Sequence, residues 1–84
     1  MNKLVMQVQE LGVIQSDEDE PVAVLYRGEW KRTESVLNRW RICQEWWKRP
    51  VERDYFRVRL EGGIICELFR ERSSGNWQLQ RVYD

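Results

Sequence analysis

The chain has 84 residues, and its 14 Lys and Arg balance 14 Asp and Glu, so the formal net charge is zero. This length allows one domain with one modest core, and a 12% aromatic content with five Trp excludes a wholly disordered chain. The apolar runs are far shorter than a membrane span, and no secretory signal pattern opens the chain, which predicts a cytoplasmic protein.

The first twenty residues carry the weakest pattern. Residues 1–10 fit a further strand, a short helix or a frayed terminus, so we treat them as a separate N-terminal segment of open state. Leu11, Val13 and Ile14 predict a short strand that pairs with residues 22–26 through an acidic turn at 16–20. The single β domain is therefore expected to span residues 11–84.

The middle of the chain reads as strands separated by turns. The run 22–26 ends at a hairpin-type turn, 27–29. Two further strands are predicted at 30–36 and 39–47, with a break at 37–38, although 33–37 also fits one helical turn. Pro50 has no backbone N–H and predicts a loop over 48–50.

The last third of the chain has the clearest β pattern. Phe56, Val58 and Leu60 share one face of a strand, while Tyr55, Arg57 and Arg59 share the other. Turn sequences at 61–63 and 73–76 separate this strand from two more, at 64–70 and 77–83. A change of parity in the last strand predicts a bulge near residue 80.

These elements define the expected fold class. Three consecutive strands joined by tight turns form a meander, and no long helix pattern interrupts the chain. We predict an all-β domain, a small twisted antiparallel meander of six or seven strands that is rolled into a small barrel.

The sequence offers no candidate residues for most kinds of catalysis. Histidine is absent, which removes the commonest general base and metal ligand, and no glycine-rich phosphate loop is present. Cys43 and Cys66 lack metal-site spacing and are expected to be buried hydrophobes, with a disulfide or a reactive thiol as the alternative. The acidic run 17–20 predicts a solvated turn rather than a cation site. We predict no enzyme, no catalytic residue, no cofactor and no metal.

Arginine and aromatic residues form the first candidate site. Five of them lie on strands that the meander makes adjacent: Arg39, Arg41, Tyr55, Arg57 and Arg59. Arginine pairs with phosphate and exposed aromatic rings stack on bases, so these residues are candidates for binding single-stranded nucleic acid. The alternative is a solvated sheet face whose arginines pair across strands with glutamates. The glutamates in question are Glu45, Glu52, Glu61 and Glu67.

The tryptophans suggest a second candidate site. Trp30, Trp40 and Trp77 are expected in the core. Successive side chains of a strand alternate, so Trp46 and Trp47 cannot both point inward. With Lys48 and Arg49 they predict a protein-binding site over these four residues, Trp46, Trp47, Lys48 and Arg49. The alternative is that the second Trp closes an open end of the barrel.

A resemblance to known proteins rests on six segments. They are PVAVLYRGEW, VLNRWRI, EWW, RDYFRV, ELFR and NWQLQRVYD, in this order, between residues 21 and 84. The set resembles an uncharacterised bacterial family of short stand-alone proteins, and it is similar to the C-terminal domain of ImuB-type proteins, which are relatives of Y-family polymerases. The resemblance implies a bacterial accessory or recruitment role in DNA repair and translesion synthesis, and it transfers no catalytic residue.

These observations lead to three functional hypotheses. The first is a non-catalytic accessory module that binds a protein partner, and the second is direct binding of single-stranded nucleic acid. The third is self-association through an edge strand, which small barrels must cover or pair. No membrane partner is expected, and the sequence leaves the oligomeric state open.

Overall fold

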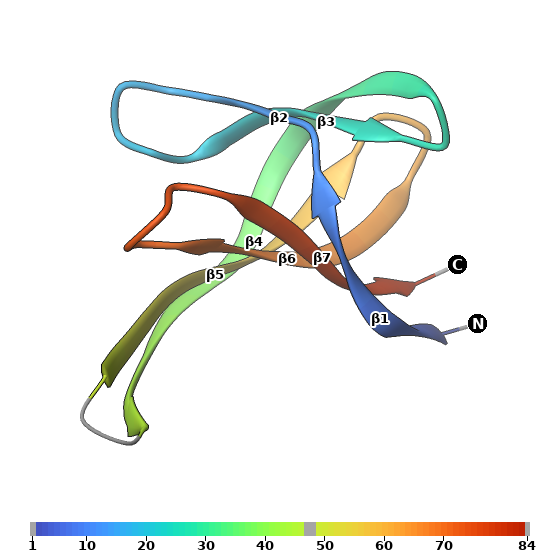
Figure 1. Ribbon diagram of the computed structural model, residues 1–84. Coiled ribbons are helices and arrows are strands. Elements are labelled where there is room, and N and C mark those ends of the chain that lie inside the picture. Colours follow the sequence, from blue (N-terminus) through green and yellow to red (C-terminus); the bar gives the residue numbers. More distant parts are fainter. Residues whose placement is uncertain (1, 47–48, 84) are drawn as a thin grey trace.

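Seven antiparallel β-strands form one sheet (Figure 1). The structure is a computed structural model that describes residues 2–46 and 49–83, with the backbone alone for residues 2–10, 46 and 49. The strands are β1 (Asn2–Leu11), β2 (Val13–Gln15), β3 (Pro21–Tyr26), β4 (Glu29–Trp46), β5 (Arg49–Leu60), β6 (Ile64–Glu71) and β7 (Trp77–Tyr83), in the sheet order β1-β7-β6-β5-β4-β3-β2. The described residues contain no helix, and hence none that could cross a membrane. The predicted all-β meander is confirmed.

The sheet curls into a half-barrel because its two outermost strands follow each other in sequence. Only Gly12 separates β1 from β2, yet Leu11 pairs with Trp77 of β7 while Val13 pairs with Val24 of β3. The indole N–H of Trp77 also donates to the side chain of Gln15, with 2.8 Å between the heavy atoms. The chain therefore passes from one edge of the sheet to the other at a single residue.

Strand β4 is much longer than predicted. Its first residues pair with β3, and from Thr33 to Trp46 it pairs with β5. The predicted break at 37–38 and the alternative helical turn at 33–37 are both wrong. Register shifts between Thr33 and Ser35 and between Val36 and Asn38 interrupt the alternation of side chains without ending the strand.

The outer part of the β4–β5 hairpin projects from the rest of the sheet, at the lower left of Figure 1. Arg49 and Pro50 belong to β5, so the predicted loop over 48–50 is wrong for these two residues; Lys48 lies outside the described part. The backbone carbonyl of Glu52 accepts from Arg72, on the side of β5 opposite to β4. Pro50 lies two residues before Glu52, so its backbone groups point to the same side of β5, away from β4. Its missing N–H therefore removes no hydrogen bond to β4.

The core lies on the face of the sheet that the alternation predicted. Phe56, Val58 and Leu60 are buried, as expected. The core cluster also contains Val24, Cys66, Leu68, Trp77, Leu79 and Val82. The register between β6 and β7 skips Gln80, because Glu67 pairs with Arg81 and Leu68 with Leu79. This confirms the predicted bulge, which brings Val82 to the face of Leu79.

Three other expectations about burial are wrong. Trp30 is 50% exposed, because it lies opposite Leu25 on the outer surface of the curled sheet. Trp40 is only partly buried and stacks on Tyr55 outside the core cluster. Cys43 is exposed because it lies on the outer part of the β4–β5 hairpin, whereas Cys66 is buried as expected.

Candidate binding surfaces

A groove of about 470 Å³ lies where the turn at 16–20 faces strands β4 and β5. The residues that line it are Glu18, Asp19, Glu20, Arg39, Trp40, Arg41, Asp54, Tyr55, Phe56 and Arg72. Arg41 lies directly opposite Asp54, and Arg39 lies opposite Phe56, so these side chains share the core face of the sheet. Alternation sends the rings of Trp40 and Tyr55 to the other face, so the groove side chains are mostly charged.

The turn at 16–20 forms the acidic side of the groove. The backbone N–H of Ser16 donates to the carbonyl of Glu20 at 2.8 Å, and the Ser16 hydroxyl accepts from the N–H groups of Glu18 and Glu20. Asp19 takes a positive φ of 60°, a conformation that Asp tolerates better than most residues. The carboxylate of Glu20 pairs with Arg39 of β4, which ties the turn to the sheet.

The basic side of the groove is a chain of ion pairs. The Nε–H of Arg41 donates to Asp54 at 2.8 Å, and Nη1 of Arg72 donates to the other oxygen of Asp54 at 3.2 Å. Arg72 also pairs with Glu52 at 3.1 Å. The hydrogen bond to Asp54 raises the pKa of the Arg41 guanidinium above its ordinary value. Each groove arginine therefore has a carboxylate partner within the chain.

The opposite face of the sheet carries an aromatic row. Tyr55 is 5% exposed, with its ring centroid 5.3 Å from that of Trp40 and 5.0 Å from that of Phe69. The guanidinium of Arg53 lies 4.7 Å from the ring centroid of Phe69, in a cation–π contact. Tyr55 was expected on an open face, but these neighbours cover its ring and leave little of it for stacking on a base.

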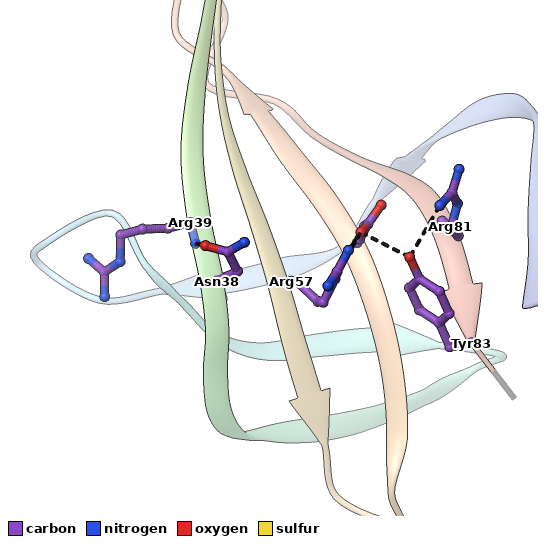
Figure 2. A network of polar contacts seen from close by, with 6 residues as sticks. Asn38, Arg39, Arg57, Arg81 and Tyr83 are labelled. Atoms are coloured by element: carbon purple, nitrogen blue, oxygen red, sulfur yellow. Dashed lines mark hydrogen bonds and ion pairs between the residues drawn. The ribbon is translucent and has the colours of Figure 1, made fainter.

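A polar network lies further along the same face (Figure 2). Glu67 is only 4% exposed and accepts two hydrogen bonds from Arg57, at 2.9 and 2.6 Å. The Tyr83 hydroxyl donates to the same carboxylate at 3.1 Å and accepts from Arg81 at 3.2 Å. The hydrogen bond to Glu67 raises the pKa of Arg57. A buried carboxylate requires such donors, which gives Arg57 a structural role.

The structure separates the five candidate nucleic-acid residues. Arg39 and Arg41 lie on the core face at the groove. The other three, Tyr55, Arg57 and Arg59, lie on the opposite face of β5, because alternation places them opposite in parity to Phe56. Arg59 is exposed, whereas Arg57 is held by Glu67. The sheet thus does not bring the five residues to one surface.

Of the four candidate protein-binding residues, the structure describes the backbone of Trp46 and Arg49, at the end of the described part of the projecting hairpin. Trp46 and Arg49 form the last backbone pair between β4 and β5. Trp47 and Lys48 lie outside the described residues. The prediction of a protein contact at Trp46, Trp47, Lys48 and Arg49 stays a prediction.

Sequence reasoning missed several polar residues that organise these surfaces. Asp54 and Arg72 at the groove, and Tyr83 in the network, received no role, since their contacts depend on the register between strands. The alternation of β5 and β6 gave one usable signal, because Arg57 and Glu67 were both noted as charged residues of neighbouring strands. No group of three or more Cys, Asp and Glu side chains within the described ranges is placed to hold a metal ion.

Comparisons with known proteins found no relative of this chain. No protein-family model, curated protein or solved structure matches this chain. The resemblance to ImuB-type proteins accordingly stays a prediction from the sequence segments alone.

Proposed function

We propose that the protein is a non-catalytic binding module and that its partner is another protein. The observation that carries the proposal is the groove between the 16–20 turn and the β4–β5 hairpin, with a volume of about 470 Å³ and charges of both signs along its walls. Its size is within the range of small binding clefts. The candidate residues Trp46, Trp47, Lys48 and Arg49 would extend the contact beyond the groove.

The charge arrangement favours a protein segment over a nucleic acid. Arg39 pairs with Glu20, Arg41 with Asp54, and Arg72 with both Asp54 and Glu52. A phosphate chain would have to compete with these carboxylates and would meet Glu18 and Asp19 at the rim. A peptide that carries both Lys or Arg and Asp or Glu can instead add to the existing pairs.

The biological setting of the proposal is DNA repair or translesion synthesis in bacteria. Its support is the resemblance of residues 21–84 to the C-terminal domain of ImuB-type proteins, which implies an accessory role. Direct binding of single-stranded nucleic acid is the competing function, and it makes a different prediction in solution.

Titration with oligonucleotides separates the two functions. The tryptophans report binding through their fluorescence, and electrostatic binding to nucleic acid is strongest at low salt. We expect no saturable quenching by single-stranded or duplex oligonucleotides at low salt. Quenching that saturates, weakens as salt rises and disappears in Arg59→Ala would instead establish nucleic-acid binding and overturn the proposal. Arg59 is the better probe than Arg57, because Arg57 also supports Glu67.

Affinity capture with matched variants tests the groove itself. Arg72→Ala removes a groove guanidinium that is exposed at the surface, and Arg59→Ala removes one from the opposite face. We expect a protein retained by the wild type to be retained by Arg59→Ala and lost by Arg72→Ala, at unchanged melting temperature. Trp47→Ala tests the candidate residues 46–49 in the same way. Equal retention by all four proteins would contradict a partner site in this region.

A further inference from the structure

The outer part of β4 has one open edge. β3 pairs with β4 only over residues 29–32, on one side of the strand, while β5 pairs with residues 33–46 on the other side. Within the described part of the chain, no strand continues along the β3 side of β4 beyond Arg32. An unpaired strand edge presents backbone donors and acceptors that favour pairing with a further strand.

The backbone pattern shows which residues face this open edge. The carbonyl of Glu52 accepts from Arg72, so Glu52 directs its backbone groups away from β4. Cys43 lies directly opposite Glu52 in the β4–β5 pair. Opposite residues of an antiparallel pair have the same bonding state, so Cys43 directs its N–H and C=O to the open edge. Arg41 and Glu45 lie two residues before and after Cys43, so their backbone N–H and C=O groups also point to the open edge.

The inner part of the edge is protected, and the protection ends at Arg39. Two bulges disrupt the strand between residues 33 and 38, which is one way to blunt an edge. The side chain of Asn38 accepts from the N–H of Arg39 at 2.9 Å, and the Arg39 guanidinium pairs with Glu20 of the overlying turn. Asn38 and Arg39 are drawn in Figure 2. No such bond or bulge is found at Arg41, Cys43 or Glu45, which are all described and exposed.

We propose that this edge pairs with the same edge of a second copy, antiparallel, across a two-fold axis at Cys43. A two-fold interface must be self-complementary, and this segment meets that requirement. The axis places Cys43 opposite Cys43 of the other copy. It also places Arg41, whose Nε–H donates to Asp54 of its own chain, opposite Glu45 of the other copy, and this pair occurs twice. The three facing residue pairs would form about six backbone hydrogen bonds, and the two Arg–Glu pairs add cross-strand attraction.

The backbone favours this register, whereas opposite charges face each other in the neighbouring register as well. Centring the axis one residue earlier, at Ile42, would set Arg41 opposite Cys43 and Arg39 opposite Glu45. The N–H of Arg39 is already bonded to Asn38, so that register would lose a backbone donor. The register at Cys43 pairs the three open residues only with one another, so no facing N–H is already bonded. The inference is separate from the proposed partner in the groove, since it concerns two copies of this chain: Arg41 belongs to both surfaces, whereas Cys43 and Glu45 do not line the groove.

A charge-exchange experiment on the purified protein tests the dimer. Glu45→Arg places Arg opposite Arg, and Arg41→Glu places Glu opposite Glu, so each variant alone should self-associate roughly tenfold more weakly or worse. Mixed together, the two variants regain both Arg–Glu pairs and should form a heterodimer. Glu34→Arg makes the same charge change on β4 in the protected inner part of the edge and should behave as the wild type. Sedimentation velocity over a concentration series, with circular dichroism to check folding, measures each case.

Cross-linking at Cys43 provides a second measurement, with Glu45→Arg as its control. A short bis-maleimide should join two copies through Cys43, because Cys66 is buried and only Cys43 is exposed. Rapid cross-linking that Glu45→Arg abolishes would support the proposal. The proposal is overturned if the wild type stays monomeric at every concentration, or if dimers form equally well with Glu45→Arg. Neither result bears on the protein partner of the groove, which Arg72→Ala tests separately.

Discussion

The two cysteines show how strongly one residue's chemistry depends on its place in the sheet. Cys66 belongs to the core cluster and is fully buried, and desolvation raises the pKa of its thiol to about 12. Cys43 lies on the projecting hairpin and is exposed. Reactivity of a thiol requires the thiolate and access to it, so the two should behave differently.

We expect one reactive thiol in the folded protein. A thiol reagent at pH 8 should modify Cys43 alone, and both cysteines should react after denaturation. Cys43→Ser is the matched control and should leave no fast-reacting thiol in the native state. Mass spectrometry of the labelled protein counts the modified residues. Fast modification of both cysteines in the native wild type would contradict the burial of Cys66.

Cys66 should also make the protein less stable in alkaline solution. Its pKa in the folded state, about 12, lies above the ordinary value of 9.0, so the unfolded chain releases this proton first as pH rises. The free energy of unfolding should therefore decrease from about pH 9 upward, and the loss should be smaller in Cys66→Ala. Urea denaturation of both proteins at pH 8 and pH 10 measures the difference. An identical pH dependence in the two proteins would contradict it.

The arginines of β5 also differ in what they do for the fold. Arg57 donates two hydrogen bonds to the buried carboxylate of Glu67, whereas Arg59 is exposed two residues further along the strand. When a buried carboxylate loses its hydrogen-bond donors, the free-energy cost of its desolvation is no longer offset, and the folded state is destabilised. The two residues look equivalent in the sequence, but only Arg57 supports a buried charge.

Arg57→Ala should therefore lower the melting temperature, and Arg59→Ala should leave it nearly unchanged. The loss in Arg57→Ala should shrink when Glu67 is replaced by Gln as well, since the amide carries no charge to compensate. Thermal unfolding of the two single variants and the double variant measures the effect. Equal melting temperatures for Arg57→Ala and Arg59→Ala would show that the network of Glu67 contributes nothing.

At the scale of elements, Gly12 decides how the sheet closes. It separates β1 from β2, and its carbonyl accepts from the N–H of Leu25 at 2.8 Å. A Cβ atom at this position would lie 3.1 Å from the Cβ of Leu25 and 3.5 Å from the ring of Trp30. The close approach of two strands thus requires a residue without a side chain.

Gly12→Val should lower the free energy of unfolding by about 1–3 kcal/mol, because the added methyl groups force Leu25 and Trp30 aside. Leu25→Ala in the same chain should recover part of the loss, since it keeps the Cβ of Leu25 but removes the Cδ2 atom that lies 3.3 Å from the added Cβ. Urea denaturation of the single and double variants tests this coupling. Additive effects of the two substitutions would argue against a direct clash.

At the scale of the whole molecule, stability comes from the face of the sheet that β5, β6 and β7 share. Leu68 has no exposed surface and lies in the core cluster with Val58 and Leu79. Val22, by contrast, is 44% exposed on β3. Among its side chains that the structure describes, the outer β4–β5 hairpin adds none beyond Phe56 to this cluster, so it depends on the core for its support.

Leu68→Ala should cost about 2–5 kcal/mol of the free energy of unfolding, the usual range for a fully buried leucine. Val22→Ala, at the exposed position, should cost less than about 1 kcal/mol. Chemical denaturation of both variants measures the two losses. Similar losses would mean that the core does not lie on the face that Leu68 shares with Val58.

Local pattern was enough to predict the elements of the last third of the chain. Alternation over 54–60 placed Phe56, Val58 and Leu60 in the core, and the parity change near residue 80 predicted the bulge. The sequence also predicted an all-β meander, because turn residues separate short β-rich runs. These features depend on neighbours within a few residues, and the sequence contains that information directly.

Only the tertiary structure decided what lies opposite each residue. The pairing of Arg57 with Glu67, the stacking that covers Tyr55 and the exposure of Cys43 and Trp30 all follow from strand register and from where the sheet curls. Register depends on the packing of strands that are far apart in sequence, and a shift of one residue moves every side chain to the other face. For this reason the sequence by itself determined the fold class, the strands of the last third of the chain and their core face, while the full length of β4, the groove, the polar network and the open edge required the folded sheet.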